Sequence, residues 1–343
     1  MKALTFHGKQ EIKHETVGDP AIKFPGDVII KVHLAGICGS DLREKGLDLG
    51  TIMGHELVGE IVELGNEVRK FRRGDVVISP FTTNCGDCFY CRDGLTCRCT
   101  AGQLLGWVQN EVGLHGAQAE YVRVPLADST LLRMPENGRE EVALLLGDVL
   151  PTGWFCAKMA EITADGVYAV IGCGPVGLMA ILSAQEMGAE KIYAIDTVDE
   201  RLRLAATFGA IPIDFAHDDP VMILQEATEG RGADAVLEVV GSPEAMRLAV
   251  NLLRPGGVLA AVGVHNESHF AFSPAEAYDK NLTFKTGRCP ARHYMEQLTG
   301  VVQKKHDDLL ALISHRLPLA EGPRGYEIFD RKLEGCTKVV LRP

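Results

Sequence analysis

The most informative segment for the fold reads Val167-Tyr168-Ala169-Val170-Ile171-Gly172-Cys173-Gly174-Pro175-Val176-Gly177. Its first five residues predict a buried strand, and a helical pattern follows the glycines. The first glycine permits a tight turn, the second lets the backbone approach a pyrophosphate, and the third lets the helix pack closely on the strand. The helix N-terminus adds positive potential. The pattern predicts a dinucleotide site that contains Gly172, Gly174, Pro175, Val176 and Gly177.

Asp196 ends the next predicted strand, 19 residues after Gly177. A carboxylate at this position accepts hydrogen bonds from the adenosine ribose and repels a 2′-phosphate, which favours NAD over NADP. Arg201 lies close by and could soften that preference. The alternative interpretation is an ordinary strand–helix turn followed by a surface aspartate.

Strands and helices alternate from about residue 153 onward, which predicts a parallel doubly wound sheet. Residues 1–152 instead carry short β-type runs between turn signals, which predicts an antiparallel, barrel-like domain. We therefore expect a first domain over 1–152 and a dinucleotide-binding domain over 153–289. The segment 290–343 ends in a predicted strand, Lys338-Val339-Val340-Leu341, and is expected to return to the first domain.

Composition excludes several functions. The 343 residues suggest about two domains, and 35 Lys+Arg against 46 Asp+Glu give a net charge of −11. That balance argues against a partner with a phosphate backbone. The sequence has no run of about 18 apolar residues, so we expect no membrane partner. The first residues lack an apolar signal core, and we expect a cytoplasmic protein.

Five of the ten cysteines fall within fifteen residues. A reduced cytosolic chain uses such a cluster for metal binding before disulfides. The spacing Cys85-x2-Cys88-x2-Cys91-x7-Cys99 predicts a closed, structural zinc site with four thiolates. On spacing alone, Cys97 could replace Cys99. The alternative is a set of buried or redox-active cysteines.

A second candidate metal site is dispersed. Gly36-Ile37-Cys38-Gly39-Ser40-Asp41 offers a thiol, a hydroxyl and a carboxylate, and His55 follows 17 residues after Cys38 beside Glu56. Alone, Cys38 is typical of a small buried residue and His55 of a satisfied histidine. Beside a dinucleotide fold, they indicate a catalytic zinc with three protein ligands and one open position.

Together these motifs resemble the zinc-dependent medium-chain alcohol dehydrogenases over essentially the whole chain. Gly147-Asp148-Val149-Leu150-Pro151-Thr152-Gly153 also matches that family. The resemblance implies a Rossmann domain and a GroES-like β-barrel catalytic domain. It is nearest to the branch of glutathione-independent formaldehyde dehydrogenases and similar secondary-alcohol dehydrogenases, in which the third ligand is an aspartate. With zinc, one thiolate and one carboxylate sum to zero charge, as two thiolates would.

The resemblance also implies roles for individual residues. Cys38, His55 and Asp148 match the catalytic zinc ligands, and Glu56 matches a neighbouring carboxylate that acts as a transient ligand. The remaining matches concern the proton path, the cofactor and the pocket: Asp41 orients the zinc histidine, Ser40 takes the substrate proton, Thr152 contacts the nicotinamide and Phe81 lines the substrate pocket. Ordinary packing is the alternative for Ser40, Thr152 and Phe81. Arg288 lies near cofactor phosphate or a polar substrate, or is a plain surface arginine.

One departure concerns the proton relay. Many relatives carry a histidine two residues after the aspartate of this motif, where this chain has Arg43. The segment from Cys38 to His55 is also several residues shorter than in relatives, so the relay and the pocket rim do not transfer. The proton would leave through cofactor ribose hydroxyls and water instead. Trp107 and the stretch 113–118 are assigned to packing of the cysteine lobe, with no chemistry.

The sequence therefore predicts reversible hydride transfer between a primary or secondary alcohol and NAD, giving an aldehyde or ketone. It predicts two zinc ions per chain and, by resemblance, a homodimer or homotetramer. A zinc-free reductase of the same fold is disfavoured because such relatives lack the Cys38, His55 and Asp148 set. An aldehyde dismutase with tightly bound NAD and a non-catalytic NAD-binding homologue stay open as alternatives.

Overall fold

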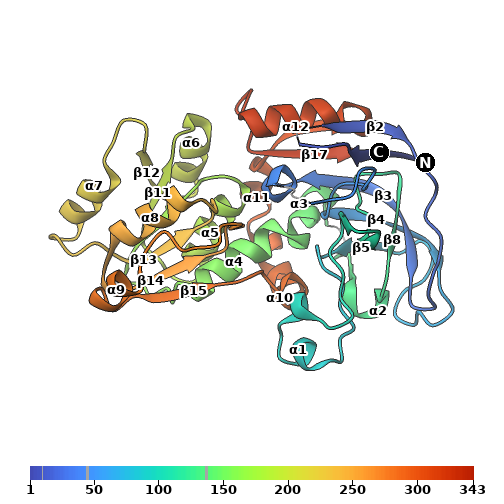
Figure 1. Cartoon of the computed structure of the whole chain (residues 1–343), viewed down its shortest axis with the longest axis horizontal. Coiled ribbons are helices and arrows are strands. Elements are labelled where there is room, and N and C mark those ends of the chain that lie inside the picture. The colour runs from blue at the N-terminus through green and yellow to red at the C-terminus, as the bar shows by residue number, and fades with distance from the viewer. Residues whose placement is uncertain (10, 44–45, 136–137) are drawn as a thin grey trace. The chain divides into compact units, whose positions relative to one another are not determined.

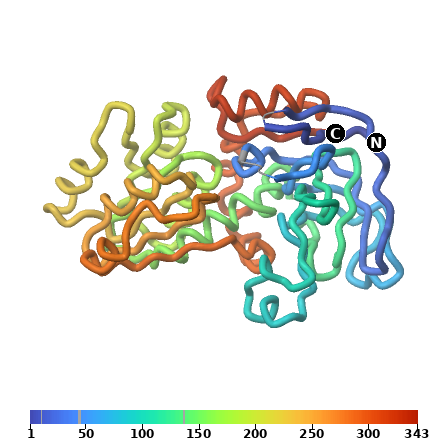
Figure 2. The backbone as a smooth tube through the Cα atoms, viewed as in Figure 1, coloured from blue at the N-terminus to red at the C-terminus, as the bar shows by residue number. Residues whose placement is uncertain are grey.

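The computed structural model describes residues 1–343 apart from residue 10 and residues 44–45 and 136–137. The chain forms two compact units (Figure 1). One unit combines Met1–Pro151 with Pro290–Pro343, and the other is Thr152–Cys289. Both chain ends lie in the first of these units (Figure 2).

The second unit is built on a six-stranded parallel sheet. Its strands are β10 (Val167–Ile171), β11 (Lys191–Asp196), β12 (Ile211–Asp214), β13 (Ala233–Glu238), β14 (Leu253–Ala261) and β15 (Thr283–Thr286). Their order is β12-β11-β10-β13-β14-β15, so the chain reverses direction across the sheet between β10 and β13. Ligands of such sheets bind outside the carboxyl ends of the strands at that reversal. The predicted Rossmann-type sheet is confirmed.

Helices connect the strands of this unit: α5 (Pro175–Glu186), α6 (Asp199–Thr207), α7 (Pro220–Ala227), α8 (Pro243–Leu252) and α9 (Pro274–Asp279). Helix α8 shows why they form and where they pack. The Ser242 hydroxyl accepts a hydrogen bond from the Ala245 amide at its start, which satisfies an otherwise unpaired amide. Met246, Ala249 and Val250 then recur at helical spacing and are buried against the sheet.

The first unit is built on a seven-stranded sheet. Its strands are β3 (Val28–Ile37), β4 (Leu57–Leu64), β5 (Val76–Ser79), β8 (Tyr121–Val124), β9 (Leu132–Arg133), β16 (Ile313–Pro318) and β17 (Lys338–Arg342). The path runs β16-β17-β3-β4-β5-β9, and β8 pairs with β3. Alternate residues Val28, Ile30 and Val32 point into one core, which matches the two-residue period of a strand. This is the GroES-like domain that the sequence predicts.

The last strand carries the C-terminal segment back to the first residues of the site. β17 pairs antiparallel with β3, with Val340 opposite Gly36 and Val339 opposite Ile37. The residues that begin β17 therefore lie beside the end of β3, where Cys38 follows. A separation of about 300 residues along the chain is closed by one strand pairing.

Smaller elements complete the first unit. Two hairpins pair β1 (Lys2–Phe6) with β2 (Ile12–Thr16) and β6 (Trp107–Gln109) with β7 (Val112–Leu114). The helices are α1 (Phe89–Arg92), α2 (Ala127–Thr130), α3 (Glu140–Leu144), α10 (Ala291–Lys304), α11 (His306–Ala311) and α12 (Gly322–Arg331), with short 3-10 turns η1 (Gly39–Arg43), η2 (Thr96–Arg98), η3 (Leu145–Gly147) and η4 (Leu319–Glu321). Helix α4 (Val149–Met159) runs from this unit into the other.

The placement of Trp107 in the packing of the cysteine lobe is wrong. Its side chain packs against the core cluster that contains Leu4, Phe6 and Met53. The β6–β7 hairpin explains this, because it pairs Trp107 with Leu114 and anchors the segment to the main core.

Within the described ranges, no single helix is both long enough and apolar enough to cross a bilayer. One bent pair, Glu140–Gly147 with Val149–Met159 at 47°, meets the criteria by length and composition alone.

Candidate active site

Three separate segments of the first unit supply the candidate ligands. Cys38 follows the end of β3, and a tight turn fixes it: its amide donates to Asp41 Oδ2 at 3.0 Å, and the Asp41 amide donates to the Cys38 carbonyl at 3.1 Å. His55 and Glu56 precede β4, after Gly54 at φ +90°. A Cβ at Gly54 would overlap the Gln118 side chain, so only glycine fits immediately before His55. Asp148 lies between η3 and α4.

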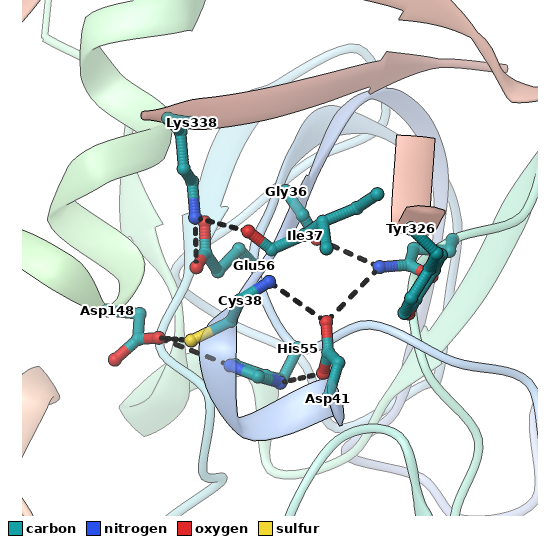
Figure 3. A network of polar contacts seen from close by, with 10 residues as sticks. Gly36, Ile37, Cys38, Asp41, His55, Glu56, Asp148, Tyr326 and Lys338 are labelled. Carbon is teal, nitrogen blue, oxygen red and sulfur yellow. Dashed lines mark hydrogen bonds and ion pairs between the residues drawn. The ribbon is translucent and has the colours of Figure 1, made fainter. Parts of the chain in front are cut away.

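These segments bring four potential ligands together. One ligand atom each from Cys38, His55, Glu56 and Asp148 lies within 4.8 Å of the others, and all four residues are buried. Figure 3 shows the imidazole of His55 between two carboxylates. Its Nε2 lies 3.2 Å from Asp148 Oδ2, and its Nδ1 lies 3.1 Å from Asp41 Oδ1. The Cys38 thiol donates to the same Asp148 oxygen at 3.3 Å.

The electrostatics of this cluster favour a positive charge at its centre. Burial alone lowers the pKa of His55, but Asp41 and Asp148 raise it well above its ordinary value. Burial alone raises the pKa of Asp148, but its hydrogen bond with His55 and the imidazole charge bring it down to about 2. Burial and the charge of Asp148 raise the pKa of the Cys38 thiol. A cation in the centre would satisfy the same groups.

The donor set fits zinc. Thiolate, imidazole and carboxylate are the ligands of this metal, and Asp41 holds Nδ1 of His55 so that Nε2 faces the other donors. Glu56 Oε2 is buried without a hydrogen-bond partner among the described residues. A buried carboxylate oxygen without a partner is costly, and the positive charge of a metal ion held by Cys38, His55 and Asp148 would offset that cost.

Three residues of this network escape sequence reasoning: Gln118, Tyr326 and Lys338. The Gln118 amide donates to the Gly36 carbonyl at 2.9 Å and lies 3.4 Å from Asp41 Oδ2, while its own oxygen accepts from the Tyr326 hydroxyl at 2.8 Å. Lys338 donates to Glu56 Oε1 at 2.6 Å. The only sequence signal is a lysine at the head of an apolar strand, and it does not reveal its partner.

The remaining residues of the expected catalytic set lie in different segments of the chain. Phe81 is buried and its ring meets that of His55 edge-on, with centroids 6.2 Å apart. Ser40 is half-buried in η1, two residues after Cys38. Thr152 is half-buried on α4, one turn after Asp148. The Arg43 side chain and residues 44–45 of the short loop lie outside the described residues.

The cysteine lobe forms a second, separate cluster. Cys85, Cys88, Cys91 and Cys99 bring their sulfur atoms within 4.8 Å of one another, and Cys97 is not part of that group. Backbone amides point at the sulfurs: the Cys85 amide donates to Cys99 Sγ at 3.2 Å, and the Cys88 amide to Cys85 Sγ at 3.3 Å. Backbone hydrogen bonds lower the pKa of Cys88 to about 6. Four thiolates with no further position fit a structural zinc site.

The glycine-rich turn follows β10 at the reversal of the parallel sheet. Gly172 has φ +91°, which favours glycine, and a Cβ there would lie 2.6 Å from Val240 Cγ2. A Cβ on Gly177 would overlap the Gly172 carbonyl oxygen, so helix α5 packs directly on the turn. A Cβ on Gly174 would meet only Arg201, with Nη1 3.6 Å away. The space over Gly174 fits a phosphate, with Pro175 and Val176 opening the helix behind it.

Asp196 has a structural role in the second unit. Its Oδ2 accepts from the Cys173 amide at 2.7 Å, and its Oδ1 from the amides of Thr197 and Val198 at 2.7 and 3.0 Å. The carboxylate thus ties the end of β11 to the glycine-rich turn. Arg201 is buried with its guanidinium beside Gly174, whereas Arg288 is exposed after β15.

Gly177→Ala is expected to weaken nucleotide binding by about 10- to 100-fold, because the methyl group separates α5 from the turn. Titration of NADH fluorescence measures the change. Gly300→Ala on α10 is the matched control, since a Cβ there meets nothing within 4 Å. Unchanged binding in Gly177→Ala would show that this turn does not hold the nucleotide.

Comparison with known proteins identifies the family. A model described as alcohol dehydrogenase GroES-like domain matches residues 24–136, and one described as zinc-binding dehydrogenase matches residues 175–304. Zinc-type alcohol dehydrogenase B of Aspergillus flavus is 41% identical over 342 residues, covering 96% of this chain and 79% of that protein. Medium chain reductase/dehydrogenase ucsI of Acremonium sp is 47% identical over 292 residues, covering 81% and 98%.

A solved structure extends the likeness to the whole fold. Alcohol dehydrogenase TADH from Thermus sp. ATN1 is 40% identical, covers 100% of this chain and 99% of its own, and superposes with a TM-score of 0.92. The resemblance to the formaldehyde dehydrogenase branch stays a prediction. By sequence, fold and matching models, this chain belongs to the zinc-dependent medium-chain alcohol dehydrogenase family.

Proposed function

We propose that the chain is an NAD-linked alcohol dehydrogenase that uses one catalytic and one structural zinc ion. The observation that carries the proposal is the buried group of Cys38, His55, Glu56 and Asp148, since it offers a thiolate, an imidazole and carboxylates within 4.8 Å. The reaction is reversible. Its substrate is a primary or secondary alcohol, and its product is the corresponding aldehyde or ketone.

Cys38, His55 and Asp148 would hold the catalytic metal, and Cys85, Cys88, Cys91 and Cys99 the structural one. When bound, a catalytic zinc supplies Lewis acidity that lowers the pKa of an alcohol hydroxyl. This chain's own residues do the positioning. Asp41 fixes the tautomer and orientation of His55, and the Phe81 ring contacts the imidazole in a T-shaped arrangement.

The proton and cofactor steps are assigned to Ser40, Thr152 and the glycine-rich turn. Ser40 lies two residues from Cys38 and is the group proposed to take the substrate proton. Thr152 on α4 is proposed to contact the nicotinamide. For the nucleotide, the open backbone at Gly174 and the carboxylate of Asp196 support NAD, and the guanidinium of Arg201 beside Gly174 supports binding of its pyrophosphate.

The test of the function is NADH absorbance after mixing the protein and NAD⁺ with primary, secondary and polyol alcohols, with and without a chelator. We expect chelator-sensitive NADH formation with at least one class, and a lower rate with NADP⁺. Metal content measured on the same sample should be two zinc ions per chain. No turnover from protein that holds both metals and NAD would contradict the proposal and favour a dismutase or a non-catalytic homologue.

A further inference from the structure

We propose that Lys338 is a positioning residue that keeps the catalytic metal site open by holding Glu56 back from the metal. The proposal rests on the zinc site proposed above and assigns a role to a residue outside the ligand set. It concerns a single interaction, the buried ion pair between Lys338 and Glu56 (Figure 3).

The ion pair is fully removed from solvent. Both side chains have 0% exposure, and Lys338 Nζ lies 2.6 Å from Glu56 Oε1. The same ammonium donates to the Ile37 carbonyl at 3.0 Å, one residue before Cys38. A buried charge is costly unless it is paired, so this lysine is fixed to two groups that border the ligand cluster.

Glu56 has one oxygen on the lysine and one directed elsewhere. Oε1 is paired with Lys338, whereas Oε2 is buried with no hydrogen-bond partner among the described residues. A carboxylate oxygen of Glu56 lies within 4.8 Å of the ligand atoms of Cys38, His55 and Asp148. The carboxylate is therefore within reach of a metal in this cluster, and the lysine is the group that restrains it.

Whether Glu56 binds the metal matters because the number of protein ligands decides whether a zinc site can bind a substrate. Three protein ligands and an open position permit a substrate to bind, whereas four protein ligands close the site. Cys38, His55 and Asp148 already make three. A Glu56 carboxylate on the metal would make four, and a lysine that holds the carboxylate preserves the open position.

Charge balance supports the same assignment. Among the four potential ligands, a thiolate at Cys38 and carboxylates at Asp148 and Glu56 carry three negative charges, and a zinc ion supplies only two positive ones. Asp41 is paired separately with His55. The ammonium of Lys338 provides the third positive charge. Without it, the buried Glu56 carboxylate has one remaining cation to approach, which is the metal itself.

The predicted effect of Lys338→Met separates this role from a merely structural one. We expect the metal to leave the site more slowly in the presence of a chelator, while the rate of alcohol oxidation falls by about 10- to 100-fold. A lysine that only supports the fold predicts the opposite change in metal retention, because a loosened site releases its ion faster. Lys338→Arg keeps the cation and should restore both properties.

Cadmium-113 NMR of protein loaded with Cd²⁺ reads the ligand set directly. The four-thiolate site and the candidate catalytic site give separate resonances, so the first is an internal reference. We expect the second resonance to move upfield in Lys338→Met, as an added oxygen donor requires, and to return to its parent position in the double variant Lys338→Met/Glu56→Gln. The double variant also removes both buried charges, so no unpaired charge remains to destabilise the fold.

The single variant Glu56→Gln keeps the test decisive if Lys338→Met does not fold. Its second resonance should match the parent, because Lys338 keeps Glu56 off the metal in the parent; a shifted resonance would overturn the proposal. Arg123→Met is the matched control, since it breaks another largely buried ion pair, with Asp27 at 2.9 Å, and should leave both resonances in place. Absence of any second resonance in the parent would instead refute the metal site itself.

Discussion

Asp148→Asn is expected to remove the catalytic metal and to lower kcat/KM for alcohol oxidation by at least about 10³-fold. Asp148 Oδ2 lies 3.3 Å from Cys38 Sγ and 3.2 Å from His55 Nε2, so its negative charge is at the centre of the ligand group. A metal that polarises a substrate oxygen contributes several kcal/mol to the rate, and each 1.36 kcal/mol is about tenfold. Metal analysis should show one zinc ion per chain in place of two.

Two further variants make this result specific. Asp148→Cys keeps an anionic ligand and should keep the metal, because a thiolate replaces a carboxylate of equal charge. Asp307→Asn makes the same chemical change at a fully exposed position and should alter neither metal content nor rate. Full activity with two metals in Asp148→Asn would show that the third ligand is another residue.

Cys91→Ser is expected to cost the chain its structural metal and to lower the free energy of unfolding by about 3 kcal/mol or more. A structural zinc contributes folding free energy directly, and loss of a metal is among the changes with the largest effects on stability. Little else holds the first part of the lobe, since α1 (Phe89–Arg92) contains no buried residue, whereas Thr96 and Cys97 of η2 are buried. Thermal unfolding with metal analysis measures the loss, and limited proteolysis should cut within residues 85–99.

Cys97→Ser is the control for this prediction, because it makes the same change within the lobe but outside the group of four sulfurs. It should keep both metals and cost about 1 kcal/mol at most, as expected for a small buried side chain. Loss of metal in Cys97→Ser together with retention in Cys99→Ser would reverse the assignment of the fourth ligand.

The second unit could be predicted in detail because its signals are local. An apolar strand, a glycine turn and a helix follow one another over residues 167–186, and the apolar residues show the pattern expected of each element. The reversal at β10 then follows from the usual order of such sheets. Asp196 was found by its distance from Gly177, although its hydrogen bond to the Cys173 amide depends on backbone geometry that spacing does not describe.

The candidate site was predictable only where its ligands sit in short motifs. Spacing alone leaves the choice between Cys97 and Cys99 as fourth ligand open. The Cys85 amide donates to Cys99 Sγ, which favours Cys99. Gln118 and Lys338 could not be found, because each acts through a partner that is distant in sequence and no periodic pattern connects them. The prediction that Trp107 packs in the cysteine lobe is wrong for the same reason, since its hairpin packs it against the N-terminal strand.

The return of β17 to β3 has a consequence for the order in which the two candidate metal sites can be completed during synthesis. All four sulfurs of the cysteine lobe lie within residues 85–99, so this centre can capture its ion while most of the chain is still untranslated. Lys338 is made 300 residues after Cys38, and the strand that carries it pairs with β3 only then. Before that moment, nothing holds the Glu56 carboxylate. If both proposed metals bind, the structural site can therefore form first, and the restrained catalytic site is completed last.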